Sequence, residues 1–272
     1  MRAYIIRRLL LVIPTLIIMS VIVFLLVRFL PGDVIDAMAK DMVFTGGTID
    51  REALEHTLGL DVPVYVQYGR WIGDIVLHGS LGESLVSRFT VKEKIIGRLP
   101  VTIQLGAMAI LIGLVIALPV GIYSAIRQDT AADYAGRTAA VIGLATPNFW
   151  IALMVLLYPA IWWGWSPPMR LIPFTEDPLG NLGVFIIPSL ILGTASAAAT
   201  MRMTRTMMLE VLRQDYIRTA WSKGLRERIV VIRHASKNAL IPVVSLIGLQ
   251  LPILVGGSVI MENIFSAWPK IR

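Results

Sequence analysis

The sequence has 272 residues, of which 56% are hydrophobic and 16% charged, with a net charge of +7 and a mean hydropathy of +0.73. Soluble domains average about 45–50% apolar and about 25% charged residues, so this composition excludes an ordinary soluble protein. The sequence contains no cysteine, which excludes disulfides and thiolate metal sites, and its three histidines lie too far apart to pair as ligands. We therefore expect a membrane protein without a metal site.

Five apolar segments are long enough to cross a bilayer, because a helix needs roughly 17 residues to span about 30 Å of hydrocarbon. The sequence therefore predicts an all-α, polytopic transmembrane helical bundle. The first segment is interpreted as an uncleaved span that follows a short tail within residues 1–30, because no small-x-small cleavage site precedes Arg28. The five segments are residues 9–27, 101–126, 138–163, 182–201 and 239–260.

The charges of the connecting segments predict which side of the membrane each one faces, since Lys and Arg in short loops mark the cytoplasmic side. The N-terminal tail carries three arginines and no acid, whereas residues 31–100 hold seven basic and ten acidic side chains. Residues 202–237 hold nine basic and three acidic side chains. We therefore place the N-terminus and the 202–237 loop in the cytoplasm, and residues 31–100 and 261–272 outside.

The external segment at residues 31–100 is predicted to contain short helices. Asp50 is placed to cap one helix that Gly59 closes, and Pro63 is placed to open a second. In the second helix Tyr68 and Trp71 fall on one face, which suits a membrane interface. This segment is either a contact surface for an external binding protein or a scaffold that lies on the membrane.

Polar residues inside the spans face either a pore or another helix, because hydrocarbon offers them no partner. Gln104, Asn148 and Gln250 are the candidates for a translocation path. The small-residue run GTASAAAT at residues 193–200 is predicted to allow close helix contact rather than to transport. No span carries an ionisable residue at its centre, which argues against a proton-coupled carrier. Residues 101–260, with the 202–237 loop, are predicted to form the transmembrane domain.

The basic loop at residues 202–237 also carries a helical pattern. Apolar residues recur at intervals of three to four from Met208 to Leu225, which predicts an amphipathic helix, and Gly224 is a natural left-handed cap that ends it. A second helical stretch is predicted from residue 225 to residue 239. Such a loop is either a connector beside anionic lipid or a folded docking element, and the pattern favours docking.

The stretch DYIRTAWSKGL, followed by RHASKNALIPV, resembles the cytoplasmic loop of ABC importer permease subunits of the dipeptide, oligopeptide and nickel class. The general motif of these subunits is Glu-Ala-Ala, three residues and Gly, from which this chain departs at the first two positions. It instead matches the peptide-class variant Tyr-apolar-Arg-Thr-Ala-x-x-Lys-Gly-Leu. The matching residues are Tyr216, Arg218, Thr219, Ala220, Lys223, Gly224 and Leu225.

Other blocks extend the resemblance over nearly the whole chain. RRLLLVIPTLIIMSVIVFLLVRFLPGD resembles the opening span of the class, and LGLDVPVYVQYGRWIGDI, GSLGESL and RLPVTIQLG resemble its first external segment. FSAWPKI resembles a late stretch of the class, but with Ala267 inserted and Lys270 where glycine is usual. Members of the class have a sixth span, so we expect residues 261–272 to be a truncated external stub and the chain to transport poorly.

The resemblance implies a transport subunit of the bacterial inner membrane that has no catalytic residue and no cofactor of its own. Its implied partners are a second homologous permease, two cytoplasmic ATPase subunits, a periplasmic or lipid-anchored binding protein and membrane lipid, but no nucleic acid. The ATPases would use ATP and Mg, since no GxxxxGK[ST] sequence is present here. The loop would form a coupling helix in a groove of an ATPase, where Ala220 and Gly224 allow close backbone approach.

Peptides are the substrate favoured by class frequency, while nickel and other small molecules stay open. The alternative function is a secondary transporter or channel that acts alone. The lack of internal inverted repeats counts against it. A membrane enzyme is a third possibility, which the absence of a visible catalytic pair disfavours.

Overall fold

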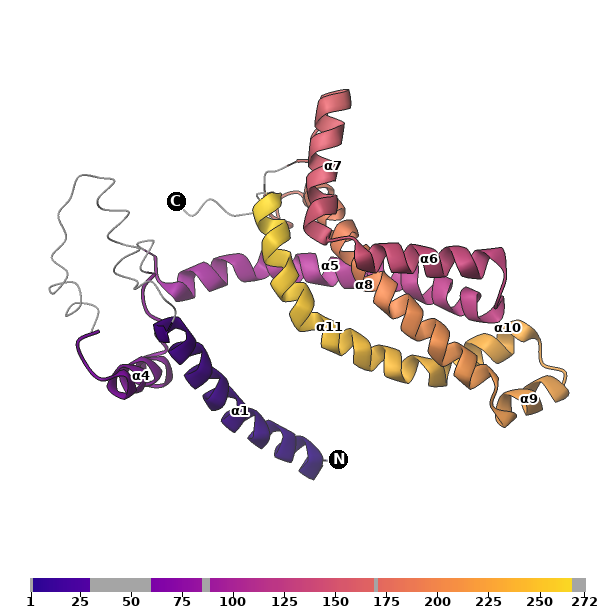
Figure 1. Cartoon of the computed structure of the whole chain (residues 1–272), viewed down its shortest axis with the longest axis horizontal. Helices are drawn as coiled ribbons and strands as arrows, with labels where there is room; N and C mark the ends of the chain where they lie inside the picture. The colour runs from indigo at the N-terminus through magenta and orange to yellow at the C-terminus, as the bar shows by residue number, and fades with distance from the viewer. Residues whose placement is uncertain (1, 30–59, 85–88, 169–170, 266–272) are drawn as a thin grey trace. The chain divides into compact units, whose positions relative to one another are not determined.

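Helices dominate the part of the chain that the structure describes. The computed structural model describes residues 2–29, 60–84, 89–168 and 171–265, and every named element in these ranges is a helix (Figure 1). This confirms the predicted all-α class. The helix expected after Asp50 and the last residues, 266–272, lie outside the described residues. The chain divides into two compact units, Met1–Ile96 and Gly97–Arg272.

The first unit contains the N-terminal helix and the helices of the predicted external segment. They are α1 (Arg2–Phe29), α4 (Val64–Gly73) and the π-helix η1 (Asp74–His78), and α4 begins directly after Pro63, as predicted. The Ser20 and Tyr68 hydroxyls of α1 and α4 lie 2.8 Å apart. The ring of Phe24 lies 5.4 Å from that of Tyr68 and 5.7 Å from that of Trp71. The predicted aromatic face of α4 therefore packs on α1.

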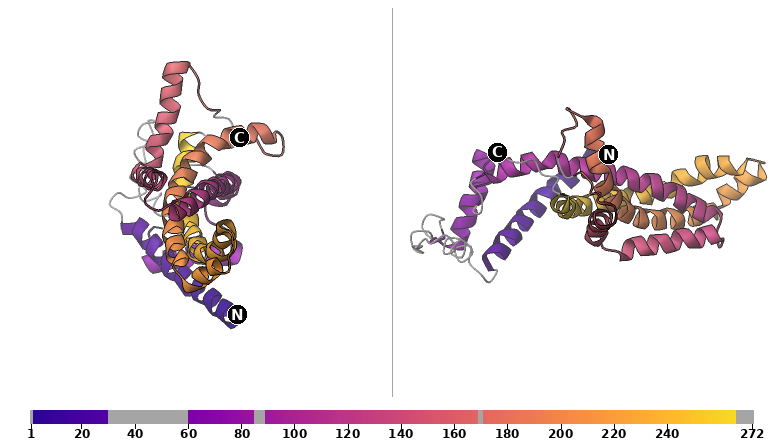
Figure 2. Two further views of the ribbon diagram at one scale, coloured as in Figure 1. Left: turned by 90° about the vertical axis from the view of Figure 1, so that its right-hand side faces the viewer. Right: turned by 90° about the horizontal axis from the view of Figure 1, so that it is seen from above.

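The second unit holds the remaining long helices. Helix α5 enters it from the first unit, beginning at a reciprocal cap in which Thr90 and Glu93 each accept a hydrogen bond from the other's N–H. The loop at residues 213–235 projects from one end of α8 and α11 in both Figures 1 and 2. The elements are α5 (Val91–Ile126), α6 (Ala131–Ala145), α7 (Asn148–Trp163), α8 (Pro178–Leu212), α9 (Asp215–Ser222), α10 (Glu227–Ile229), the π-helix η2 (Val230–Ala235) and α11 (Ser236–Ile264).

Four stretches of the described residues are long and apolar enough to cross a membrane as single helices. Three contain one predicted span each, and the first covers the predicted span 9–27 up to Leu26. They lie in α1, in α5, in α8 and in the stretch Glu227–Ile264 that includes α11. The last one continues four residues beyond the predicted end of its span, into the expected stub. The side of the membrane that each loop faces stays a prediction.

The segment predicted as a continuous span at residues 138–163 is broken in the structure. Helices α6 and α7 meet at an angle of 91°, so together they form either a broken span or a re-entrant loop, and α7 turns away from α6 in Figure 1. The break is at Thr146 and Pro147, both of which have extended backbone. The physical reason is that proline has no N–H to donate and disfavours a helical conformation in the residue before it.

Small residues bring α5 and α8 into backbone contact. On α5 the residues Ala109, Gly113, Ala117 and Gly121 recur every four positions and are buried. A Cβ added at Gly193 of α8 would lie 2.8 Å from the Ala109 carbonyl oxygen. Such close approach is the usual way in which helices pack inside a membrane. The run at residues 193–200 therefore packs against α5, as predicted.

Candidate functional site

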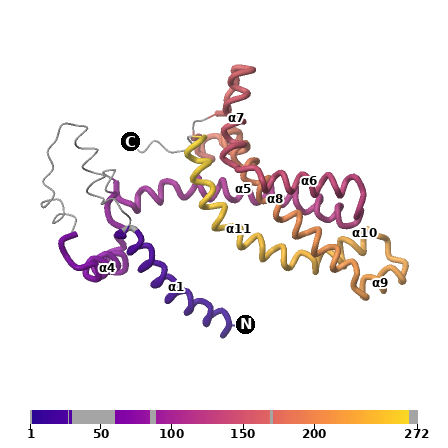
Figure 3. The backbone as a smooth tube through the Cα atoms, viewed as in Figure 1, coloured from indigo at the N-terminus to yellow at the C-terminus, as the bar shows by residue number. Residues whose placement is uncertain are grey.

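The basic loop begins as a continuation of α8. The helix ends at Leu212, eleven residues past the predicted membrane edge at Met201. Figure 3 shows α8 leading into the short helix α9. Gln214 is then extended, and α9 starts as a separate helix. The single amphipathic helix expected from Met208 onward is therefore two helices. The apolar spacing continued across the turn, so periodicity alone did not reveal it.

The loop has a hydrophobic core of its own. The side chains of Met208 on α8, Ile217 on α9, Val230 on η2 and Ala239 on α11 are all fully buried and belong to one cluster. The end of α5 joins the same cluster through Ala125. Because five separate helices contribute to this core, the loop is a folded element and not a bare connector.

Two faces of α9 have different surroundings. Ile217 and Ala220 point into the loop core, and Leu225 packs against it from the following turn. Ala220 is only 6% exposed, so its small size serves packing within this chain. The predicted close approach of Ala220 to a partner backbone would require this core to open.

The opposite face of α9 is open to solvent. Its exposed residues include most of those that matched the peptide-class motif. The hydroxyl of Tyr216 also accepts a 2.8 Å hydrogen bond from the side-chain amide of Asn238, which ties α9 to α11. The exposed motif residues are Tyr216, Arg218, Thr219, Lys223 and Gly224.

Gly224 ends α9 as the sequence predicted. Its φ is +74°, in the left-handed region that favours glycine, and a Cβ added there would meet no atom within 4 Å. The requirement for glycine at this position is therefore one of backbone conformation and not of space within this chain.

Trp221 is a surface residue that the sequence analysis passed over, because it occupies an unspecified position of the motif. Its side chain lies on the exposed side of α9 and is 45% exposed. A large aromatic side chain left in solvent on a folded loop is typical of a protein interface. The signal available in the sequence was a tryptophan that lies outside the predicted apolar repeat of this helix.

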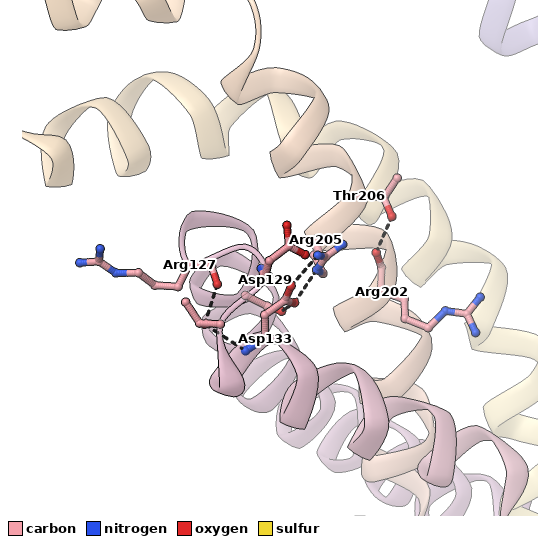
Figure 4. Close-up of polar contacts among 8 residues, drawn as sticks. Arg127, Asp129, Asp133, Arg202, Arg205 and Thr206 are labelled. Carbon is pink, nitrogen blue, oxygen red and sulfur yellow. Dashed lines mark hydrogen bonds and ion pairs between the residues drawn. The ribbon is translucent and has the colours of Figure 1, made fainter.

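A buried ion pair joins the first turn of α6 to the extension of α8. Arg205 donates from Nε and Nη2 to the two carboxylate oxygens of Asp133, at 2.7 Å each, and Asp133 is fully buried (Figure 4). Both residues lie outside the predicted spans. Sequence analysis missed the pair, because its members are 72 residues apart.

Comparison with known proteins assigns the chain to a family. Residues 117–269 match the model of the binding-protein-dependent transport system inner membrane component, and residues 1–106 match the model of the N-terminal part of such membrane components. The chain belongs to this permease family. It is thus a transport subunit of the inner membrane and not an enzyme, as the sequence predicted.

Named relatives of the permease cover its whole length. It is 39% identical over 274 residues to the oligopeptide transport system permease protein AppB of Bacillus subtilis, covering 100% of this chain and 85% of that one. It is 38% identical over 295 residues to the dipeptide transport system permease protein DppB of Escherichia coli, covering 100% and 86%. A putative peptide transport system permease protein of Brucella suis is 38% identical over 266 residues, covering 98% and 83%.

The three candidates for the translocation path occupy different places in the permease. Gln104 donates to Asn181 near the start of α8, whereas Gln250 accepts from Ser196, at 2.6 Å, and donates to a second side chain near the middle of α8. Asn181 and Ser196 are about 22 Å apart along the helix at 1.5 Å per residue. Asn148 begins α7 at the bend after α6. Both glutamines therefore connect helices, and the structure does not gather them into one site.

A carboxylate that is not among the three path candidates is also buried in the second unit. Thr102 of α5 donates a 2.7 Å hydrogen bond to the carboxylate of Glu262 on α11, which is 2% exposed. In the described ranges no group of three or more His, Cys, Asp or Glu side chains is placed to hold a metal ion.

Proposed function

We propose that this permease forms, with a second homologous permease, the path by which an importer takes up peptides. The relatives named for oligopeptide and dipeptide transport support this substrate class, since the chain aligns with them over its full length. In this proposal a periplasmic or lipid-anchored binding protein delivers the peptide. Two cytoplasmic ATPase subunits bind and hydrolyse ATP with Mg, and this chain holds no cofactor.

The ATPase is proposed to dock on the exposed face of α9. The observation that carries this is a short helix whose inner side, Ile217 and Ala220, is held by the loop core while its outer side is left open. Tyr, Trp and Arg are the residues that most often dominate binding energy at protein interfaces. The outer side carries one of each, in Tyr216, Trp221 and Arg218.

Charge supports the same surface. Arg218 and Lys223 are exposed, and Arg218 pairs with Asp215 at 3.4 Å, with both side chains largely in solvent. Such an exposed pair contributes little and is readily exchanged for another partner. An ATPase groove lined by carboxylates would therefore attract this face and orient it.

The docking proposal is tested by co-purifying the cognate ATPases with the permease in detergent. Trp221→Ala and Arg218→Ala are each expected to weaken ATPase binding about thirtyfold, the effect of losing about 2 kcal/mol at an interface hot spot. The matched control is Trp150→Ala, which removes an indole that is 51% exposed on α7. Equal recovery of ATPase with all three variants would contradict docking through α9.

The peptide proposal is tested separately by uptake in proteoliposomes that contain the complete importer. Labelled di- and tripeptides are expected to accumulate when ATP is supplied and the cognate binding protein is present. Uptake of nickel in place of peptides would overturn the substrate class but leave the docking site untouched. ATP-independent uptake by the permease alone would instead favour a transporter or channel that acts without ATPases.

A further inference from the structure

The carboxylate of Asp133 is the centre of a closed set of hydrogen bonds. One oxygen accepts from Arg205 Nε and from the Ser124 hydroxyl, and the other accepts from Arg205 Nη2 and from the Asp129 backbone N–H at 3.1 Å. These donors come from the end of α5, the α5–α6 turn and α8. Both carboxylate oxygens of Asp133 therefore have hydrogen-bond donors within the chain, and its negative charge is paired with Arg205. Three elements contact this one side chain.

The turn is shaped around this carboxylate. Asp129 has a φ of +60°, a conformation that residues other than glycine seldom adopt, and in it the Asp129 N–H points to Asp133. Thr130 then caps α6 by accepting from the Asp133 N–H. The start of α6 is thus built to hold Asp133 at one position relative to α5.

Arg205 lies between the spans and the loop core. It is four residues after Met201, the predicted edge of the membrane, and three before Met208, which is fully buried in the loop core. At the same level α5 comes so close to α8 that a Cβ on Gly121 would be 2.9 Å from the Met201 carbonyl oxygen. Arg202, one turn away, is exposed and points away from Asp133 (Figure 4).

We infer that the Asp133–Arg205 pair is a positioning link, which makes the start of α6 and the extension of α8 move as one body when an ATPase moves α9. The inference rests on the proposed docking of α9. Contacts through Met208 and its apolar neighbours are not directional, so they restrain the rotation and height of α8 less than a directional pair does. A bidentate pair fixes both rotation and height, because its two parallel hydrogen bonds require one geometry.

The energetics of burial indicate that the pair serves to fix the position of α8 relative to α6 more than to stabilise the fold. Removing two charges from water offsets most of their mutual attraction, and apolar residues of similar size often stabilise a protein as well or better. A buried pair is therefore best explained by the single geometry that it imposes. Arg205 lies on α8 between its predicted span and the turn to α9, so the pair fixes the helix where the chain passes from α9 to the span.

The test uses the complete importer in proteoliposomes, and measures peptide transported per ATP hydrolysed. Arg205→Lys keeps the charge but loses the paired donors, and Asp133→Asn keeps the shape but loses the charge. Both are expected to retain bound ATPase and ATP hydrolysis while transport per ATP falls about tenfold, within the range found for single positions that couple two sites. The matched controls are Arg202→Lys and Glu210→Gln, two exposed residues of α8, and both should leave the ratio unchanged.

Two further measurements distinguish the possible outcomes: recovery of transport per ATP in a charge-exchanged double variant, and the amount of ATPase bound to each variant. Partial recovery of transport per ATP in the exchanged variant, Asp133→Arg with Arg205→Asp, would support a link that depends on the pair itself. An unchanged ratio in Arg205→Lys, or a loss of ATPase equal to the loss of transport, would overturn the inference. Failure of the docking proposal is recognised independently, because Trp221→Ala would then bind ATPase normally while the pair is intact.

Discussion

The two halves of α8 pack by different physical means. Within the predicted span, at residues 182–201, contact with α5 depends on small residues that let backbones touch, as at Gly193. Beyond it, the helix is held by a bidentate ion pair at Arg205 and by a hydrophobic core around Met208. Lipid tails are as apolar as the side chains, so only close fit favours helix contact there, whereas water drives burial in the loop. One helix thus obeys two packing rules along its length.

The largest effect is expected in the loop core. Met208→Ala should lower the free energy of unfolding by about 2–5 kcal/mol, because a buried side chain is replaced by a cavity. Hydrogen–deuterium exchange should rise first in peptides from α9 and η2 while the α5–α8 contact stays protected. The control is Met19→Ala on α1, where the side chain is 53% exposed. Loosening of the spans at the same time would mean that the two halves are one cooperative unit.

A somewhat smaller effect is expected within the span. Gly193→Val should destabilise the permease by about 1–3 kcal/mol, the usual cost of overpacking, because the new side chain meets the backbone of α5. Thermal unfolding of the purified protein measures this. Gly248→Val on α11 is the control, since a Cβ there meets nothing within 4 Å. An equal loss in both variants would show that helix propensity, and not close fit, is responsible.

The smallest effect is expected for the polar contact between α8 and α11. Gln250→Leu should cost about 1 kcal/mol, because it removes two hydrogen bonds to α8 and the average for one between membrane helices is about 0.6 kcal/mol. Asn263→Leu is the control, because that amide bonds to the carbonyl oxygen of Val259 within its own helix. If Gln250→Leu instead abolishes peptide uptake without changing the thermal unfolding, Gln250 belongs to the translocation path and not to helix packing.

Local features of the structure could be predicted from the sequence because they depend on neighbouring residues. Proline at position 63 opened α4, and glycine at position 224 ended α9 in a left-handed conformation. The break at Thr146 and Pro147 was missed, although proline was visible there, because apolar length alone was used to define the span.

The orientation of α9 shows the limit of the same reasoning. The apolar repeat predicted from Met208 to Leu225 includes Tyr216 and Ala220 on one helical face, whereas the structure buries Ala220 and leaves Tyr216 exposed. The chain turns at Gln214, so positions before and after it no longer share a helical register. Which side of α9 faces inward depends on Met208 and Val230, which come from other helices.

By itself, the sequence determined the membrane class, the approximate position of the apolar helices, the fold of the basic loop into helical pieces and, by resemblance, the family. Apolar length, charge and turn residues act over a few positions and can be recognised without knowing the packing. Only the tertiary structure decided that Asp133 meets Arg205, that Gln104 and Gln250 bind separate parts of α8, and that Ala220 is internal. Each of these depends on how separate helices are placed side by side, for which a single sequence contains no local pattern.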